Sequence, residues 1–251
     1  MKKIFFTIIA VFVLCLQNVY AQESQPEVQN KNVYKVQAVQ YYFSDSEIMD
    51  EMKIQEHISN IGFKLLNANK IEKRMVFKYS KKDKLIKGVP ELSKRQTVIY
   101  DKAIQYANSD DEVAALLARE IVKTAESYSG FMRGFVTSAQ IKAAPKKYEI
   151  FFDKRAVDFM VNAGYNPVAM IVYINKAYPQ KRFDIIGGHN LTSKRLANIY
   201  EYIYTKYPYF LKNNEYLTNE YYQNFLLTSQ DNRKKLQEKI KSGSKEKIKY
   251  E

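Results

Sequence analysis

The chain contains one cysteine and two histidines among its 251 residues. Cys15 lies in an apolar N-terminal segment that we expect to be cleaved off, which leaves the mature chain with no residue for a disulfide or for thiolate chemistry. His57 and His189 are then the two imidazoles that the mature sequence offers to a metal ion. After the N-terminal segment the sequence has no long apolar run, so we expect the mature protein to be soluble.

The first 21 residues have the three-part organisation of a secretory signal peptide. Lys2 and Lys3 precede the apolar stretch Ile4–Leu16, and residues 19–21 (VYA) form a small-residue cleavage site before Gln22. The alternative is a membrane anchor that is retained, although the apolar stretch is short for a helix that spans a bilayer. We therefore predict an exported protein, either periplasmic or secreted.

Basic residues outnumber acidic ones, and the formal net charge is +13. The excess is spread along the chain and rises in the Lys-rich tail Lys234–Lys249. A nucleic-acid-binding protein would concentrate such charge on one recognisable module, which the sequence lacks, so we expect no nucleic-acid partner. The simpler interpretation is an exported basic protein that faces anionic envelope surfaces.

Hydrophobic periodicity predicts a mostly helical α+β protein with a small sheet. Helices are expected over residues 46–69, 109–130, 146–163, 167–178, 192–207 and 213–227, and strands over 33–43, 74–79 and 96–103. The segment 131–144 fits either a helix or an ordered loop, and the charged tail from residue 231 is expected to be frayed. We divide the chain into a signal peptide (1–21), a polar leader with the first strand (22–45), a main domain (46–210), and a C-terminal helix with a basic tail (211–251).

The helix over residues 109–130 is the best specified. Ser109 and Glu112 form a capping box, and a glycine at the far end is a suitable stop. At about 100° per residue, one stripe of this helix contains Glu120 together with apolar residues at positions 113, 116, 117 and 121. We therefore expect Glu120 to point into the core, with Arg119 and Lys123 on the flank of the stripe. The alternative is a surface glutamate that pairs with Lys123 at i,i+3 spacing.

Three segments in order carry recognisable motifs: Asp111–Lys123 (DEVAALLAREIVK), Glu149–Pro167 (EIFFDKRAVDFMVNAGYNP) and Gly187–Leu196 (GGHNLTSKRL). Together they resemble the zinc metallopeptidases of the CAAX-prenyl-protease type, in the branch of the heat-shock protease HtpX and the periplasmic protease BepA. That family has H-E-x-x-H on a helix, then E-x-E-A-D and A-G-Y-x-P, and finally a loop with a histidine and an arginine. The resemblance implies a zincin-like metallopeptidase fold for the main domain.

Four residues of this chain match functional positions of that family. Glu120 matches the glutamate that acts as general base, and Asp153 matches an aspartate that supports the metal ligands. His189 and Arg195 match a histidine and an arginine that lie near the active-site cleft. The resemblance implies that these four residues lie around one cleft, with Glu120 in the catalytic position.

The positions that match the zinc ligands carry other residues. Arg119 and Lys123 stand where the family has its two histidines, and Phe151 stands where it has a glutamate as third ligand. Arginine stays protonated and has no lone pair to offer, lysine must first lose a proton, and phenylalanine has no donor atom. Without a metal, water keeps a pKa near 15.7 rather than about 7. We therefore expect no metal, no other cofactor and no peptidase activity.

We interpret the two cations as replacements for the metal. In this hypothesis Arg119 or Lys123 occupies the space of the lost zinc, pairs with Glu120 and Asp153, and holds two helices together. Glu120→Ala would then leave a buried positive charge and destabilise the fold by about 3–5 kcal/mol.

The sequence leaves three functions open. The first is an inactive peptidase homologue that binds polypeptide, with an edge strand at 96–103 as the expected binding element, and serves as a scaffold for envelope assembly. The second is an active zinc metallopeptidase with an unorthodox ligand set such as His189, Asp153 and Glu149. The third is a basic surface protein that binds anionic glycans, lipids or nucleic acid. We favour the first, because all three ligand positions are lost while Glu120 and Asp153 remain.

Overall fold

The computed structural model of the protein describes residues 46–72, 75–82, 96–127, 131–178 and 190–250. The described residues from 51 onward belong to one compact unit. The predicted signal peptide, the polar leader with its strand, and the candidate residue His189 lie outside the described residues. Within the described ranges, no helix has both the length and the apolar character needed to cross a membrane.

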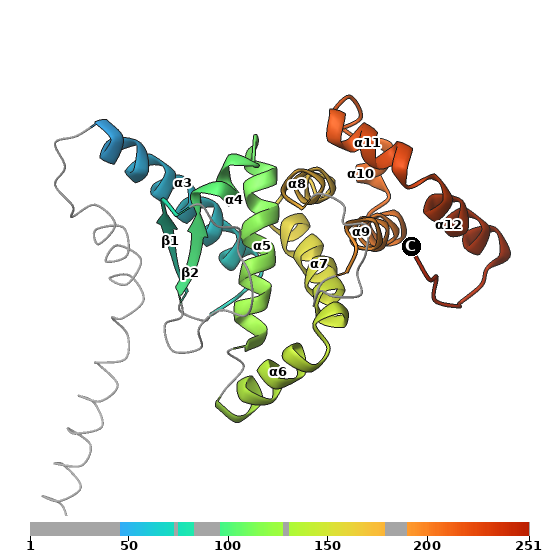
Figure 1. The fold of residues 1–251 in the computed structure, drawn as a ribbon, viewed down its shortest axis with the longest axis horizontal. Helices are drawn as coiled ribbons and strands as arrows, with labels where there is room; N and C mark the ends of the chain where they lie inside the picture. The colour runs from blue at the N-terminus through green and yellow to red at the C-terminus, as the bar shows by residue number, and fades with distance from the viewer. Residues whose placement is uncertain (1–45, 73–74, 83–95, 128–130, 179–189, 251) are drawn as a thin grey trace, which may run out of the picture. The chain divides into compact units, whose positions relative to one another are not determined.

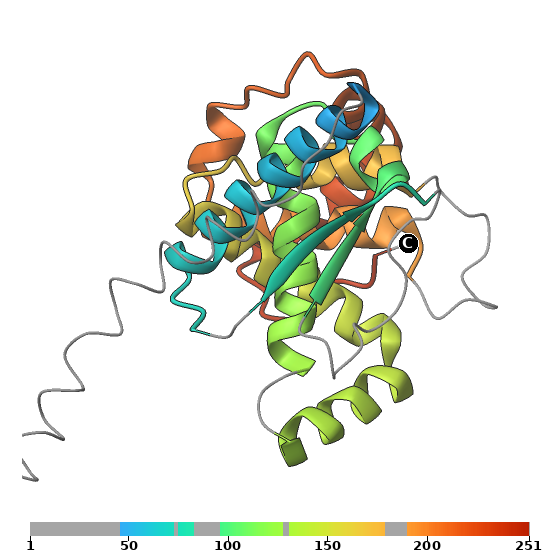
Figure 2. The same ribbon diagram turned by 90° about the vertical axis from the view of Figure 1, so that its left-hand side faces the viewer.

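The small sheet consists, in the described part of the chain, of two parallel strands (Figure 2). These are β1 (Val76–Ser80) and β2 (Gln96–Tyr100), and alternate residues of both strands are buried. α3 (Ser46–Ala68) packs closely on the sheet through Gly62, where an added Cβ atom would lie 2.5 Å from the ring of Phe77. A side chain at Gly62 would therefore push the helix away from the sheet.

The second strand is shorter than predicted. It ends at Tyr100, and α4 (Asp101–Gln105) occupies the positions 101–103 that were predicted as strand. Asp101 lies in the first turn of α4, where a carboxylate is favourable at the positive end of the helix dipole. Its Oδ1 also accepts a hydrogen bond of 2.5 Å from the hydroxyl of Tyr79 on β1, which fixes the point where the strand gives way to the helix.

The core is built around α5, which lies between the sheet and a layer of helices (Figure 1). α5 (Asp110–Ser127) packs on α7 (Pro145–Asn162) and α8 (Ala169–Ala177), and α9 (Thr192–Lys206) packs on α7 and α8. The predicted inward stripe of α5 is confirmed, since its members at positions 113, 116, 117, 120 and 121 are all at most 5% exposed. A carboxylate, Glu120, is thus placed among core residues.

The predicted capping box at the start of α5 is confirmed in part. Oγ of Ser109 accepts a hydrogen bond of 3.3 Å from the backbone N–H of Glu112. The Glu112 carboxylate instead accepts from the backbone N–H of Asn108 and from Nζ of Lys176, at 3.1 and 2.7 Å. The buried pair of Glu112 and Lys176 therefore ties α8 to the first turn of α5.

Two helix predictions in the middle of the chain need adjustment. The segment that fitted either a helix or a loop forms α6 (Phe131–Ala143). The helix predicted from residue 167 begins at Ala169, because Oδ1 of Asn166 accepts the backbone N–H of Val168 and holds the chain in a turn before the helix.

The C-terminal segment differs most from the prediction. The helix predicted over 213–227 begins only at residue 220, as α11 (Glu220–Thr228), which Oδ1 of Asn219 caps. The short helix α10 (Tyr209–Lys212) precedes the predicted range. The tail that was expected to be frayed forms α12 (Gln230–Ser242), which buries Leu236. The predicted class, mostly helical α+β with a small sheet, is confirmed.

Candidate functional site

Six charged side chains from three helices, with Glu120 among them, meet in the core. Each is less than a tenth exposed. We call this group the ionic cluster, and its members are Arg119, Glu120 and Lys123 of α5, Glu149 and Asp153 of α7, and Arg195 of α9. The three carboxylates balance the three cations, so the cluster carries no formal net charge.

Asp153 lies at the centre of the cluster and binds two arginines. Its Oδ2 accepts from Nε of Arg195 at 2.8 Å, and its Oδ1 accepts from Nη2 of Arg195 at 3.0 Å. The same Oδ1 accepts from Nε of Arg119 at 2.8 Å. A forked pair of this kind matches the planar guanidinium to the carboxylate. Asp153, with an exposed fraction of 1%, therefore joins α5, α7 and α9 at one point.

Glu149 is the second carboxylate on the inner face of α7. Its Oε2 accepts from the backbone N–H and from Nδ2 of Asn190, at 2.7 and 3.0 Å. Its Oε1 lies 3.5 Å from Nη2 of Arg119 and 3.7 Å from Nε of Arg195. The two guanidinium groups also lie 5.9 and 5.1 Å from the centre of the Tyr178 ring, which adds a cation–π contact for each.

Glu120 pairs with Lys123 within α5. Nζ of Lys123 donates to Oε1 of Glu120 at 2.7 Å, and Nη1 of Arg119 lies 3.9 Å from the same oxygen. The sequence hypothesis that Arg119 or Lys123 pairs with Glu120 and Asp153 agrees with these contacts for Arg119, which reaches both carboxylates, whereas Lys123 pairs with Glu120. The alternative of a surface glutamate is wrong, although its i,i+3 partner was correct, since both side chains of the pair are at most a tenth exposed.

The pKa values of the cluster follow from burial and from these pairs. Burial raises the pKa of the Asp153 carboxyl, but the two arginines lower it more, so the net shift is downward. The pKa of Glu149 is lowered for the same reason. Burial lowers the pKa of Lys123 below its ordinary value, and the charge of Glu120 offsets only part of that effect. Both α7 carboxylates are therefore held in the ionised form.

Phe151 does not lie in the cluster. Its side chain is 44% exposed and packs against Tyr148 and Phe152, with ring centres 6.4 and 5.7 Å apart. The α7 residues that reach Arg119 of α5 are Asp153 and, one helical turn earlier, Glu149. The sequence interpretation treated Glu149 only as an alternative ligand, although the four-residue spacing of the two carboxylates already placed them on one face of the helix.

The donor atoms of the cluster do not fit a catalytic zinc ion. In the ranges that the structure describes, no group of three or more His, Cys, Asp or Glu side chains is arranged to hold a metal. Both oxygens of Asp153 accept hydrogen bonds from arginine, and the positions matched to histidine ligands present cations instead. A divalent ion would therefore have to displace Arg119 and Lys123 from their carboxylate partners before any ligand could reach it.

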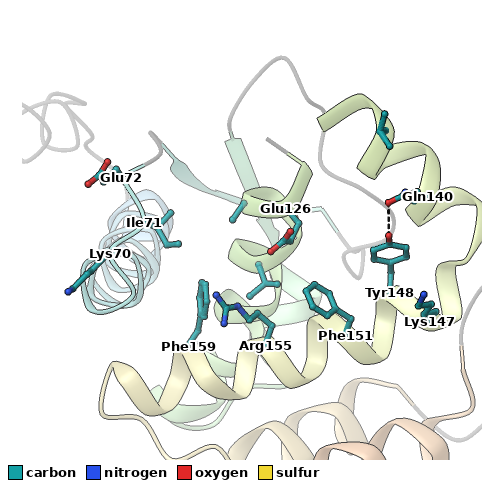
Figure 3. Close-up of a pocket in the computed structure, with 13 residues that line it drawn as sticks. Lys70, Ile71, Glu72, Glu126, Gln140, Lys147, Tyr148, Phe151, Arg155 and Phe159 are labelled. Carbon is teal, nitrogen blue, oxygen red and sulfur yellow. Dashed lines mark hydrogen bonds between the residues drawn. The ribbon is translucent and has the colours of Figure 1, made fainter. Parts of the chain in front are cut away.

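An open groove runs along the other side of α7. It has a volume of about 930 Å³ and lies between α5, α6, α7 and the residues that follow α3. Figure 3 shows Phe159, Arg155 and Phe151 in line along α7, with Tyr148 beyond them and Glu126 of α5 opposite. The hydroxyl of Tyr148 donates to Oε1 of Gln140 on α6 at 2.8 Å and closes one end of the groove.

Comparison with known proteins leaves the three motifs as the basis of the resemblance. No family model, no curated protein and no solved structure matches the chain. Membership of the CAAX-prenyl-protease type therefore stays a prediction. The geometry adds one observation, which is that five of the residues aligned with the motifs meet in space: Arg119, Glu120, Lys123, Asp153 and Arg195.

Proposed function

We propose that this chain is an exported, non-catalytic relative of the CAAX-type zinc metallopeptidases, with a zincin-like fold, that binds polypeptide and serves as a scaffold in the cell envelope. The observation that carries the proposal is the charge-balanced ionic cluster. It stands at the positions aligned with the H-E-x-x-H motif and with its supporting aspartate, and every member has a partner of opposite charge.

The cluster supports the loss of catalysis through its chemistry. A zinc peptidase uses the metal to lower the pKa of bound water to about 7, and a nearby glutamate removes the proton. Here the carboxylate of Glu120 is occupied by Lys123 and is 2% exposed. The guanidinium of Arg119 keeps its proton and presents no lone pair to a metal.

The same cluster supports a structural role for the former catalytic residues. Arg119 and Arg195 reach Asp153 from two different helices, so the Asp153 carboxylate links α5, α7 and α9. A buried pair that loses one partner costs about 3–5 kcal/mol, because the remaining charge stays in a medium of low polarity. Selection for stability would therefore preserve such a set after catalysis is lost.

Binding of polypeptide is supported by the groove on the other side of α7. Val136 and Phe151 are 49% and 44% exposed there, and an exposed apolar patch within a concave surface is typical of a binding site. The strand edge predicted at 96–103 remains a second candidate over its shortened range, Gln96–Tyr100.

Metal content of the purified protein tests the proposal. We expect well below one zinc per chain after zinc supplementation, measured by elemental mass spectrometry. About one zinc per chain would overturn the non-catalytic reading and favour an active enzyme with His189, Asp153 and Glu149 as ligands. Hydrolysis of an unstructured protein substrate that Glu120→Gln abolishes would lead to the same conclusion.

A matched variant tests the zincin-like fold separately. Arg119→His/Lys123→His introduces two imidazoles one helical turn apart, and Oε1 of Glu149 on α7 already lies 3.5 Å from Nη2 of Arg119. We expect this variant to bind about one zinc per chain while the unmodified protein does not. A folded double variant that takes up no zinc would count against the peptidase-like arrangement, and circular dichroism of the same sample establishes that it is folded.

A further inference from the structure

The outer face of α7 carries a regular ladder of cationic and aromatic side chains. Lys147, Phe151, Arg155 and Phe159 follow one another at intervals of four residues, and all four line the groove. Lys147, Phe151 and Arg155 are exposed, and the guanidinium of Arg155 lies 5.5 Å from the centre of the Phe159 ring. The wall therefore offers positive charge on both sides of an exposed aromatic ring.

This ladder lies on the opposite face of α7 from the ionic cluster. At about 100° per residue, positions 147, 151 and 155 are turned by roughly 160–240° from Glu149. The burial pattern agrees, because Glu149 and Asp153 are 5% and 1% exposed whereas Phe151 is 44% exposed. A ligand in the groove would therefore contact neither Glu120 nor Asp153.

The spacing of the ladder fits an extended peptide. Steps of four residues along an α-helix are about 6 Å, and alternate residues of a β-strand that face the same side are about 6.6 Å apart. Three successive side chains on one face of a strand can thus meet Lys147, Phe151 and Arg155 in turn. Such a strand needs an acidic residue, an apolar residue and an acidic residue at alternate positions.

The opposite wall sets the other face of the strand. Glu126 of α5 lies across the groove from Arg155 and Phe151, and Glu72 lies with Lys70 toward the Phe159 end (Figure 3). Side chains that point to this wall meet mixed charge, so small polar residues suit it. Acidic residues are favoured on the α7 side alone, where Lys147 and Arg155 lie.

From this juxtaposition we propose that the groove between α5, α6 and α7 binds an extended acidic segment of a partner polypeptide, with an apolar side chain seated against Phe151 and acidic side chains at Lys147 and Arg155. This inference rests on the proposed scaffold function and names its binding site and the chemistry of its ligand. The binding site is then a different surface from the former catalytic centre.

Fluorescence anisotropy with two labelled peptides tests the inference. The first has Glu, Leu and Glu at alternate positions with serine between them, and the second has the same composition with the two glutamates adjacent. We expect the alternating peptide to bind the purified protein more tightly. Phe151→Ala and the double variant Lys147→Glu/Arg155→Glu should each weaken its binding about tenfold or more.

A second charge-reversal pair controls for the general positive charge of the protein. Lys212→Glu/Lys234→Glu changes two exposed lysines outside the groove by the same net charge. We expect this pair to weaken binding less than about twofold at physiological salt, where charges farther apart than about 8 Å are screened. An equal loss of peptide affinity in both double variants would overturn the proposed binding site, because it would show that the peptide is attracted to the positive charge of the whole surface.

The two proposals fail in different ways. If the alternating peptide does not bind, or binds Phe151→Ala as well as the unmodified protein, the groove is not its site, whatever the zinc content of the protein. If the protein holds about one zinc per chain, the scaffold proposal fails even where the groove variants behave as expected. The zinc analysis and the anisotropy are therefore made on the same preparation.

Discussion

The two faces of α7 use charge in opposite ways. On the inner face, Glu149 and Asp153 are almost fully buried and contact arginines of two other helices. On the outer face, Lys147 and Arg155 are exposed on either side of an exposed phenylalanine. The difference teaches that one helix can use buried charges to join its neighbours and exposed charges to line a groove, and that alignment with a motif does not separate the two, since Phe151 is aligned with a ligand position and lies on the outer face.

The strongest test of the inner face is Asp153→Ala. The substitution removes the carboxylate that binds both Arg119 and Arg195, which then remain buried with less compensating charge. We expect a loss of about 4–5 kcal/mol in the free energy of unfolding, measured by urea denaturation. The matched control is Asp231→Ala on α12, whose exposed carboxylate should change stability by no more than about 0.5 kcal/mol. Similar losses in the two variants would contradict the role of Asp153.

Glu120→Ala should have a smaller effect that depends on pH. It leaves Lys123 without its nearest carboxylate, at a cost of about 3 kcal/mol near neutral pH. Burial already lowers the pKa of Lys123 below its ordinary value of 10.5, and loss of Glu120 lowers it further. Between the folded and unfolded pKa values the unfolded chain binds more protons, so stability rises with pH in that window. Urea denaturation at pH 7 and pH 9.5 should therefore show a penalty that shrinks at the higher pH. A penalty that stays constant or grows would contradict this account.

The fold could be predicted where the information is local. The helical spacing of the apolar residues in α5 placed Glu120 in the core, and Ser109 marked the start of the helix. The prediction for the C-terminal segment was wrong because its helix boundaries depend on two contacts that hydrophobic periodicity does not describe. These are the cap that Asn219 provides for α11 and the burial of Leu236, which orders α12.

The site could be predicted only in part, for a related reason. Motif positions identified Asp153 and Arg195, but not the pair that they form across 42 residues of sequence. Phe151 was assigned by alignment with a motif, and the rotation of the helix shows that Glu149 faces the cluster instead. Charge balance across three helices is a property of the packed core, so it could not be read from any one segment.

Acid should reduce the contribution that the inner face of α7 makes to the free energy of unfolding. The folded-state pKa values of Glu149 and Asp153 lie below the ordinary 4.5 and 3.8, so the unfolded chain binds more protons just below pH 4.5. Stability from these groups is present above that pH and is lost as pH falls through the folded pKa values. We expect Asp153→Asn to flatten the fall in unfolding free energy between pH 5 and pH 3.

Asp111 provides a contrast to Asp153, because burial raises its pKa. Its stabilising effect is largest at low pH, so Asp111→Asn should steepen the fall instead. A steeper fall in Asp153→Asn would rule out the assigned sign.

The smallest effect on stability is expected on the outer face, where adjacent phenylalanines provide a direct comparison. Phe151 is 44% exposed and Phe152 is 3% exposed, and both belong to the same turn of α7. Phe152→Ala should cost about 3–5 kcal/mol because it leaves a cavity in the core. Phe151→Ala should cost no more than about 1 kcal/mol, since much of its ring is already in contact with water. Thermal denaturation of the two variants measures the difference. If Phe151→Ala were as destabilising as Phe152→Ala, the exposed ring would be part of the core rather than of a binding surface. A stable Phe151→Ala that no longer binds the alternating peptide would show that this side chain is kept for a ligand.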